Sequence, residues 1–209
     1  MGERLPEVAE AFPPAGEAFL LFQEASPRLW QQTDLLLVPP GVTGRTDFGN
    51  AMAMDDRFFF IGAMREDTRG IPNEPGAVYA YRWAKTGSPE LVQELEPGPV
   101  DYGPSFGFSL AIEGDTLVVG AIARRWVADR SIGAAYAYRY DGERWVLRQE
   151  LLAPEPQGGA RFGWDVSLDG GLPAIGARGE LGTTGVGAAH PFRRADRLDG
   201  GRHRLRRGG

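Results

Sequence analysis

Few residues of this chain have the types and spacing that bond-making chemistry needs. Its 209 residues include no cysteine and two histidines, His190 and His203. The Gly-x-Ser-x-Gly turn that exposes a nucleophilic serine does not occur. Asp55 and Asp56 are adjacent in sequence, so they cannot flank a glycosidic bond from opposite sides as the carboxylates of a glycosidase do. We therefore predict no catalytic residue, no enzyme activity and no thiolate metal site.

Arginine and aromatic residues favour a binding role instead. Residues of this kind are the usual anchors of protein interfaces, and binding residues concentrate in loops. The predicted ligand-binding set comes from two loops, with Tyr102 in the loop at about 98–105 and Arg124, Arg125, Trp126 and Arg130 in the loop at 122–132. Its predicted partner is a protein or a carbohydrate. The alternative is that Trp126 only packs its own loop against the body of the protein.

Composition narrows the class of protein. Hydrophobic residues make up 42% and charged residues 24% of the chain, which is typical of a globular protein. No apolar run reaches the roughly 20 residues of a membrane-spanning helix, and the first residues do not form a secretory signal peptide. Residues 193–209 hold seven arginines and two aspartates. This tail resembles a disordered segment more than a nucleic-acid contact, so we predict no nucleic-acid partner.

A repeated unit organises the rest of the chain. Phe-Gly pairs begin at 48, 106 and 162, and Gly-Ala pairs begin at 62, 120 and 176. The successive spacings are 58 and 56 residues for both pairs. A third element follows at 76–82, 133–139 and 187–193, and a fourth at 91–97 and 146–154. Such a period indicates a repeat architecture.

Each element reads as a β-strand. After Phe106, large Leu110 and Ile112 alternate with small Ser109 and Ala111, and side chains alternate between the two faces of a strand. A sheet with one bulky and one small face suits a stack in which the bulky face of one sheet meets the small face of the next. The Phe-Gly and Gly-Ala pairs recur at fixed offsets, and this regularity favours a β-propeller over a β-sandwich. In the hairpins between the first two elements, we expect Gly, Asp and Asn to supply positive φ angles.

This unit resembles the FG-GAP repeat of integrin-α-type β-propellers, in its bacterial form, over residues 16–192. The resemblance implies a propeller of seven blades, an extracellular or cell-surface location, and ligand-binding loops gathered on one face of the disc. It also implies calcium in an Asp-x-Asp-x-Asp-Gly loop between the first two strands of a blade. The corresponding turns at 55–57, 113–115 and 169–171 hold too few oxygen ligands. We therefore predict no cofactor and no calcium at the usual place.

The predicted fold is all-β, a partial β-propeller of four-stranded antiparallel blades. An irregular segment, 1–15, precedes a partial blade at 16–40, full blades at 41–98 and 99–155, a partial blade at 156–192 and the tail at 193–209. Propellers typically have four to eight blades, so this set does not close a ring. The chain is then either a fragment of a longer propeller or self-associates through its open blade edges.

The predicted function is a non-catalytic recognition or adhesion module of a bacterial FG-GAP repeat protein. One alternative is an accessory propeller domain of an extracellular hydrolase or lyase. A second is a truncated gene fragment without independent function. The third repeat favours the second alternative, because Pro173 stands where the other copies have Leu117 and Phe59 and His190 stands where they have a tyrosine.

Overall fold

The computed structural model of the chain describes residues 19–23, 30–36, 46–65, 76–84, 89–97, 105–123, 126–127, 130–155, 158–179 and 187–192. These residues form strands and turns, with no helix among them, which confirms the predicted all-β class. The predicted N-terminal segment 1–15 and the tail 193–209 lie outside the described residues.

Three antiparallel sheets carry the three repeats. The first sheet has the order β3 (Phe48–Met54), β4 (Phe58–Ala63), β5 (Ala77–Trp83), β6 (Pro89–Leu95). The second sheet has the order β7 (Phe106–Glu113), β8 (Thr116–Ala121), β11 (Ala134–Tyr140), β12 (Trp145–Leu151). The third sheet has the order β13 (Phe162–Asp169), β14 (Leu172–Ala177), β15 (Ala188–Pro191). Two full and two partial blades were predicted; the two four-stranded sheets correspond to the full blades and the three-stranded sheet to the second partial blade.

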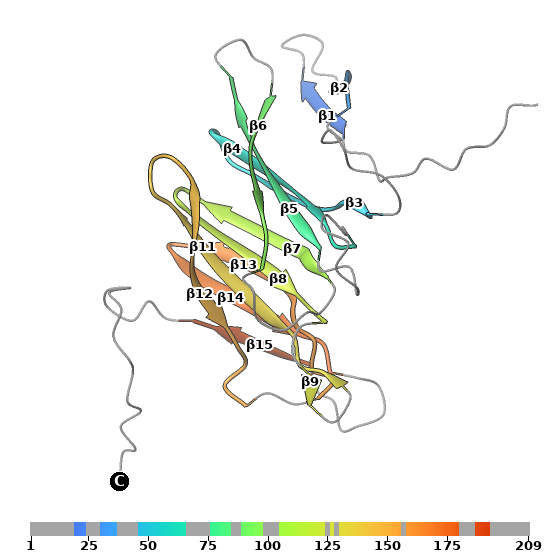
Figure 1. Ribbon diagram of the computed structural model, residues 1–209, viewed down its shortest axis with the longest axis vertical. Coiled ribbons are helices and arrows are strands. Elements are labelled where there is room, and N and C mark those ends of the chain that lie inside the picture. Colours follow the sequence, from blue (N-terminus) through green and yellow to red (C-terminus); the bar gives the residue numbers. More distant parts are fainter. Residues whose placement is uncertain are drawn as a thin grey trace, which may run out of the picture.

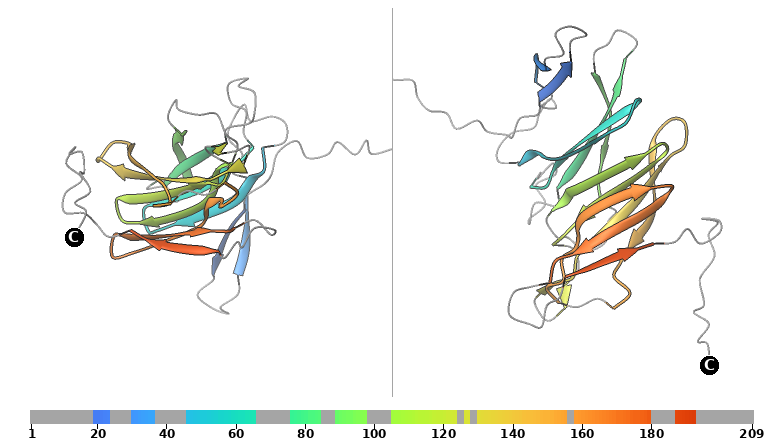
Figure 2. Two further views of the ribbon diagram at one scale, coloured as in Figure 1. Left: turned by 90° about the horizontal axis from the view of Figure 1, so that it is seen from below. Right: turned by 180° about the vertical axis from the view of Figure 1, so that it is seen from behind.

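The sheets lie face to face in chain order, as Figures 1 and 2 show. An antiparallel hairpin of β1 (Phe19–Gln23) and β2 (Trp30–Leu36) lies beyond the first sheet. A second small hairpin, β9 (Trp126–Val127) with β10 (Arg130–Ser131), was not predicted. It interrupts the connection between β8 and β11. Within the described residues the stack is open and does not close into a ring.

The Phe-Gly pair makes a bulge at the start of each sheet. Phe106 pairs with Ala121, but the next pair along the strands is Ser109 with Gly120, so Gly107 and Phe108 are extra residues. Gly107 has a φ of 85°, a conformation that glycine adopts without steric penalty. The same register shift separates the first two pairs of β3 with β4 and of β13 with β14. The repeated motif therefore encodes a repeated bulge.

The Gly-Ala pair allows two sheets to approach each other closely. A β-carbon on Gly62 would lie 2.2 Å from the carbonyl oxygen of Gly107 in the second sheet. Asn50 reinforces this contact, since its Nδ2 donates to the carbonyl oxygens of Gly107 and Phe108 at 3.1 and 3.2 Å. The glycine of one repeat thus faces the Phe-Gly glycine of the next, which explains why both are repeated in phase.

Apolar side chains fill the space between the sheets. Between the second and third sheets, small residues such as Ala135 receive large ones such as Phe162 and Ile175, as predicted. Between the first and second sheets the accepting face also carries Phe58 and Phe60, so the prediction of a small face is wrong there. Both phenylalanine rings meet the indole of Trp145 edge-on. The centroid of the Trp145 ring lies 5.4 Å from that of Phe58 and 5.1 Å from that of Phe60. Burying one such side chain contributes roughly 1.5–3 kcal/mol.

The hairpin turns between the first two strands of each sheet differ in construction. Gly114 and Gly170 have positive φ angles, as predicted for the second and third turns. The first turn has no positive φ, so the prediction is wrong there. Its Asp55 carboxylate accepts hydrogen bonds at 2.8 Å from the amides of Arg57 and Phe58 instead. A side chain that binds the backbone in this way replaces the glycine.

Candidate functional site

The described ends of two loop sets meet at one end of the stack. The amide of Arg65, just after β4, donates to the carbonyl of Thr46 at 3.0 Å. The amide of Ser105, just before β7, donates to the carbonyl of Met64 at 3.1 Å. Residues after the second strand of the first sheet thus contact residues before the Phe-Gly pairs of the first and second sheets. We call this end, with residues 46–50, 64–65, 105–108, 131–133, 159–164 and 178, the loop end.

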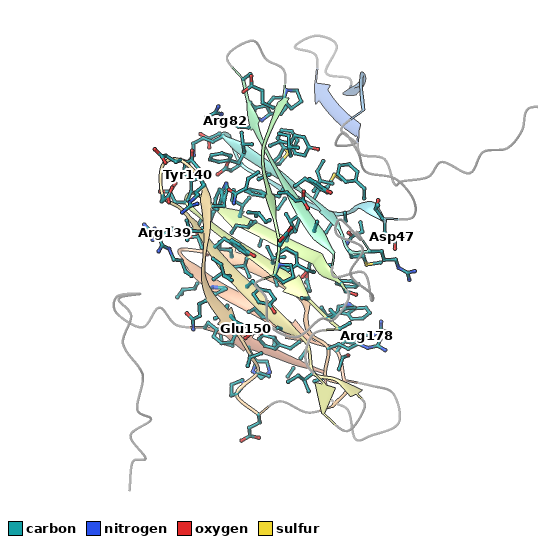
Figure 3. The ribbon with its side chains drawn as sticks, viewed as in Figure 1. Asp47, Arg82, Arg139, Tyr140, Glu150 and Arg178 are labelled. Atoms are coloured by element: carbon teal, nitrogen blue, oxygen red, sulfur yellow. The ribbon has the colours of Figure 1, made fainter. Side chains whose placement is uncertain are left out.

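Aromatic and arginine side chains gather at the loop end. The rings of Phe108 and Trp164 lie 5.0 Å apart between centroids. The guanidinium carbon of Arg178 lies 4.5 Å from the centroid of the Trp164 ring, and that of Arg161 lies 6.0 Å away. We call these four residues the Trp164 cluster. Figure 3 labels Arg178 on the side of the molecule opposite Tyr140.

The bulge of each Phe-Gly pair positions this cluster. Phe108 and Trp164 are equivalent residues, each directly after the glycine of the pair and within the bulge. Bulges commonly re-aim a side chain at the end of a strand. Arg161 precedes its Phe-Gly pair and has a φ of 49°, which a non-glycine residue rarely adopts. The ring and guanidinium groups provide an apolar surface next to positive charge, without a nucleophile or general base.

The equivalent residue of the first repeat has a structural role. Asn50 stands where Phe108 and Trp164 stand in the later repeats. Its Oδ1 accepts a hydrogen bond from the amide of Met64 at 3.2 Å, and its Nδ2 binds the second sheet. Nearby, Arg65 forms an ion pair with Asp47 at 2.9 Å. At the first sheet, the described polar side chains thus bind the protein itself.

The sequence-predicted binding residues are placed only in part. Tyr102, Arg124 and Arg125 lie outside the described residues. Trp126 lies on β9 and Arg130 on β10, where Trp126 pairs with Ser131 and Arg130 with Val127. The structure describes the backbone of this hairpin and not the side chains of these two residues. Their role in binding stays a prediction.

Sequence reasoning overlooked the Trp164 cluster. The available signal was an aromatic residue directly after the Phe-Gly pair in two of three repeats, Phe108 and Trp164. Arg178 follows the Gly-Ala pair of the third repeat, 14 residues after Trp164. Only the pairing of β13 with β14 brings these positions together.

Acidic residues at the opposite end bind the protein itself. This hairpin end comprises the turns 55–57, 113–115 and 169–171. Asp115 pairs with Arg57 at 2.9 Å, and this hydrogen bond raises the pKa of the Arg57 guanidinium. The carboxylate of Glu113 accepts hydrogen bonds from the amides of Gly170 and Gly171 at 2.9 and 2.7 Å. In the part of the chain that the structure describes, no three His, Cys, Asp or Glu side chains form a group able to hold a metal ion.

The described residues include one of the two histidines. His190 lies on β15, and its ring is 5.6 Å from that of Phe162 between centroids. This contact matches its place in the repeat, because Tyr136 in the same position lies 5.6 Å from Phe106. The histidine is therefore part of the sheet packing. Among the described residues, no helix is long and apolar enough to cross a lipid bilayer.

Comparison with known families matches the chain to the FG-GAP repeat at residues 91–138 and 145–192. Comparison with curated proteins gives no match. Each matched stretch includes the outer strand of one sheet, β6 or β12, and the three strands that begin the next sheet. The family's unit is thus displaced by one strand from the sheets of the structure. Residues 91–192 therefore contain two FG-GAP repeats.

Proposed function

We propose that this chain is a non-catalytic module for recognition or adhesion, which binds an acidic protein or glycan through its loop end. The contact between Arg178 and the Trp164 ring is the observation that carries the proposal. A guanidinium group pairs well with carboxylate or sulfate groups, and an indole ring packs against the apolar parts of a ligand. Aromatic and arginine side chains are also the usual energetic centres of interfaces.

The non-catalytic part of the proposal has its own support. His190 packs against Phe162, and the described turn carboxylates Asp55, Glu113 and Asp115 bind the protein's own backbone or Arg57. The proposed extracellular location follows from the family resemblance. Separating the cells from the medium of an expressing culture, and probing both for the native protein, tests that location.

Binding measurements on the 209-residue chain test the proposal. The probes are sulfated, uronic-acid and neutral polysaccharides together with acidic peptides, measured by biolayer interferometry. Arg178→Ala removes an exposed guanidinium, and Arg178→Lys retains the charge without the planar group. We expect Arg178→Ala to weaken binding to an acidic probe at least about tenfold, with a smaller loss for Arg178→Lys.

Arg139→Ala is the matched control, because Arg139 is exposed and Figure 3 labels it on the opposite side of the molecule. It should leave the affinity unchanged. The proposal is overturned if no acidic probe binds, or if Arg178→Ala and Arg139→Ala weaken binding equally.

A further inference from the structure

The interface between the first and second sheets and the interface between the second and third sheets are built in the same way. Each consists of two complementary surfaces, which we call its halves. The glycine half is the face around the Gly-Ala glycine, and Gly62 and Gly120 supply it in the first and second sheets. The Phe-Gly half is the first strand of the next sheet. Its bulge glycine approaches the Gly-Ala glycine, and its large apolar residues pack on the preceding sheet. In the second and third sheets these apolar residues are Leu110, Ile112, Val166 and Leu168.

The third sheet carries a glycine half that no other sheet among the described residues covers. Gly176 occupies the place of Gly62 and Gly120 in the repeat. The nearest atoms to a β-carbon there belong to Asp165 of the same sheet, at 3.6 Å, whereas the corresponding distance is 2.2 Å at Gly62 and at Gly120. Ala174 and Ala189 on this face are exposed. The small surface that receives the next sheet is therefore present and open.

The first sheet carries the complementary half, also open along its first strand. Met52 and Met54 are 60% and 62% exposed. Val166, which corresponds to Met52 in the repeat, is 7% exposed because it packs against the second sheet. On the same face, Phe59 and Tyr79 are already buried, so the available surface is the strand β3.

We infer that two copies of this chain stack head to tail, with β3 of one copy on the β13–β14 face of the other. A second copy is the occupant because the chain carries both halves of an interface that it already forms twice within itself. The halves differ from each other, so the contact is heterologous and can add further copies. The surface is confined to one strand on one side, so we expect weak, concentration-dependent association.

The turns at the hairpin end determine the salt dependence. Within the chain, neighbouring sheets bring these turns together, as Arg57 with Asp115 and Glu113 with Gly170 demonstrate. In the head-to-tail pair, the turn with Asp169 would meet the turn with Asp55 and Asp56 of the other copy. These carboxylates repel one another, and salt screens that repulsion. Association should therefore strengthen as the ionic strength rises.

Sedimentation velocity on purified full-length variants tests the proposal. Gly176→Ala places a methyl group where the other copy's Phe-Gly backbone must pass, while the space within its own sheet accommodates it. The double substitution Met52→Glu with Met54→Glu places charge on the other half. Each variant alone should remain monomeric at concentrations where the unsubstituted chain associates. A mixture of the two variants should form a one-to-one pair, because each retains the half that the other has lost.

Leu147→Glu is the control, since Leu147 is 37% exposed on β12 and belongs to neither half. It should associate as the unsubstituted chain does. Circular dichroism checks that all variants are folded. The proposal is overturned if the unsubstituted chain is monomeric throughout the micromolar range. It is also overturned if the mixed variants do not pair, or if association persists in each variant alone, since another surface would then be responsible.

Discussion

A β-carbon on Gly120 would lie 2.2 Å from the carbonyl oxygen of Gly163 in the neighbouring sheet. The Ser109 hydroxyl donates a hydrogen bond to this same oxygen at 2.8 Å. The carbonyl is part of the backbone of the Phe-Gly bulge, so it cannot move aside as a flexible side chain would. This one contact joins the two motifs that define the repeat.

Gly120→Ala should therefore destabilise the fold strongly. The added methyl group must push two sheets apart, and we expect a loss of about 3 kcal/mol or more in the free energy of unfolding. Gly176→Ala is the matched control, because it changes the equivalent glycine at a place that no other described sheet approaches. Chemical denaturation at low protein concentration measures both. Equal losses for the two variants would contradict a role for sheet contact.

Tyr138→Phe tests a polar link between the first two sheets. The Tyr138 hydroxyl on β11 donates to the carbonyl of Glu96, just after β6, at 2.7 Å. Removing the hydroxyl from this partly buried pair should lower the free energy of unfolding by about 1–2 kcal/mol. Tyr140→Phe removes an exposed hydrogen bond to Gly142 and should change it by less than about 0.5 kcal/mol. Urea denaturation of both variants checks the difference, and a larger effect at Tyr140 would refute it.

Gln93→Ala tests the contact between the outer strands β6 and β12. The side-chain Nε2 of Gln93 donates to the backbone carbonyl of Trp145 at 3.0 Å, and the side-chain Oε1 accepts from the backbone amide of Trp145 at 2.8 Å. The side chain thus bonds to β12 as the backbone of a neighbouring strand would. Losing both bonds should destabilise the fold by about 1–2 kcal/mol. Gln149 holds the same place in the second sheet but is exposed, so Gln149→Ala should have little effect. Thermal unfolding compares the two variants, and equal melting temperatures would count against the link.

Asp141 should make stability depend on acid pH. Its carboxylate accepts hydrogen bonds from the amides of Arg144 and Glu143, and these lower its pKa in the folded protein. A folded-state pKa below the unfolded value stabilises the fold above the unfolded pKa of about 4, and this contribution disappears as the pH falls through the folded pKa. Asp141→Asn keeps an acceptor oxygen but does not titrate.

Melting temperatures measured from neutral pH into the acid range check this prediction. The unsubstituted protein should lose stability more steeply than Asp141→Asn below about pH 4. Parallel curves for the two proteins would show that the Asp141 carboxylate is not responsible.

The sequence by itself determined the strands, the repeat and the stacking of sheets. Alternation of large and small residues, as at Ser109 to Ile112, is a local property of a strand and is read directly from the order of the residues. The fixed offset between Phe-Gly and Gly-Ala pairs also predicted that each sheet would be built alike. Both predictions concern contacts within one unit of the repeat or between identical units, so the pattern contains the necessary information.

The tertiary structure alone decided which side chains meet across units and ends of strands. Phe108 and Trp164 are 56 residues apart, and their contact depends on the sheets' separation and on the direction of two bulges. Arg178 reaches Trp164 because the bulge shifts the register of β13 against β14. Likewise, only the stack shows that a neighbouring described sheet approaches Gly62 and Gly120 closely and that none approaches Gly176. Periodicity records the face on which a side chain lies, and it does not record which other unit stands opposite that face.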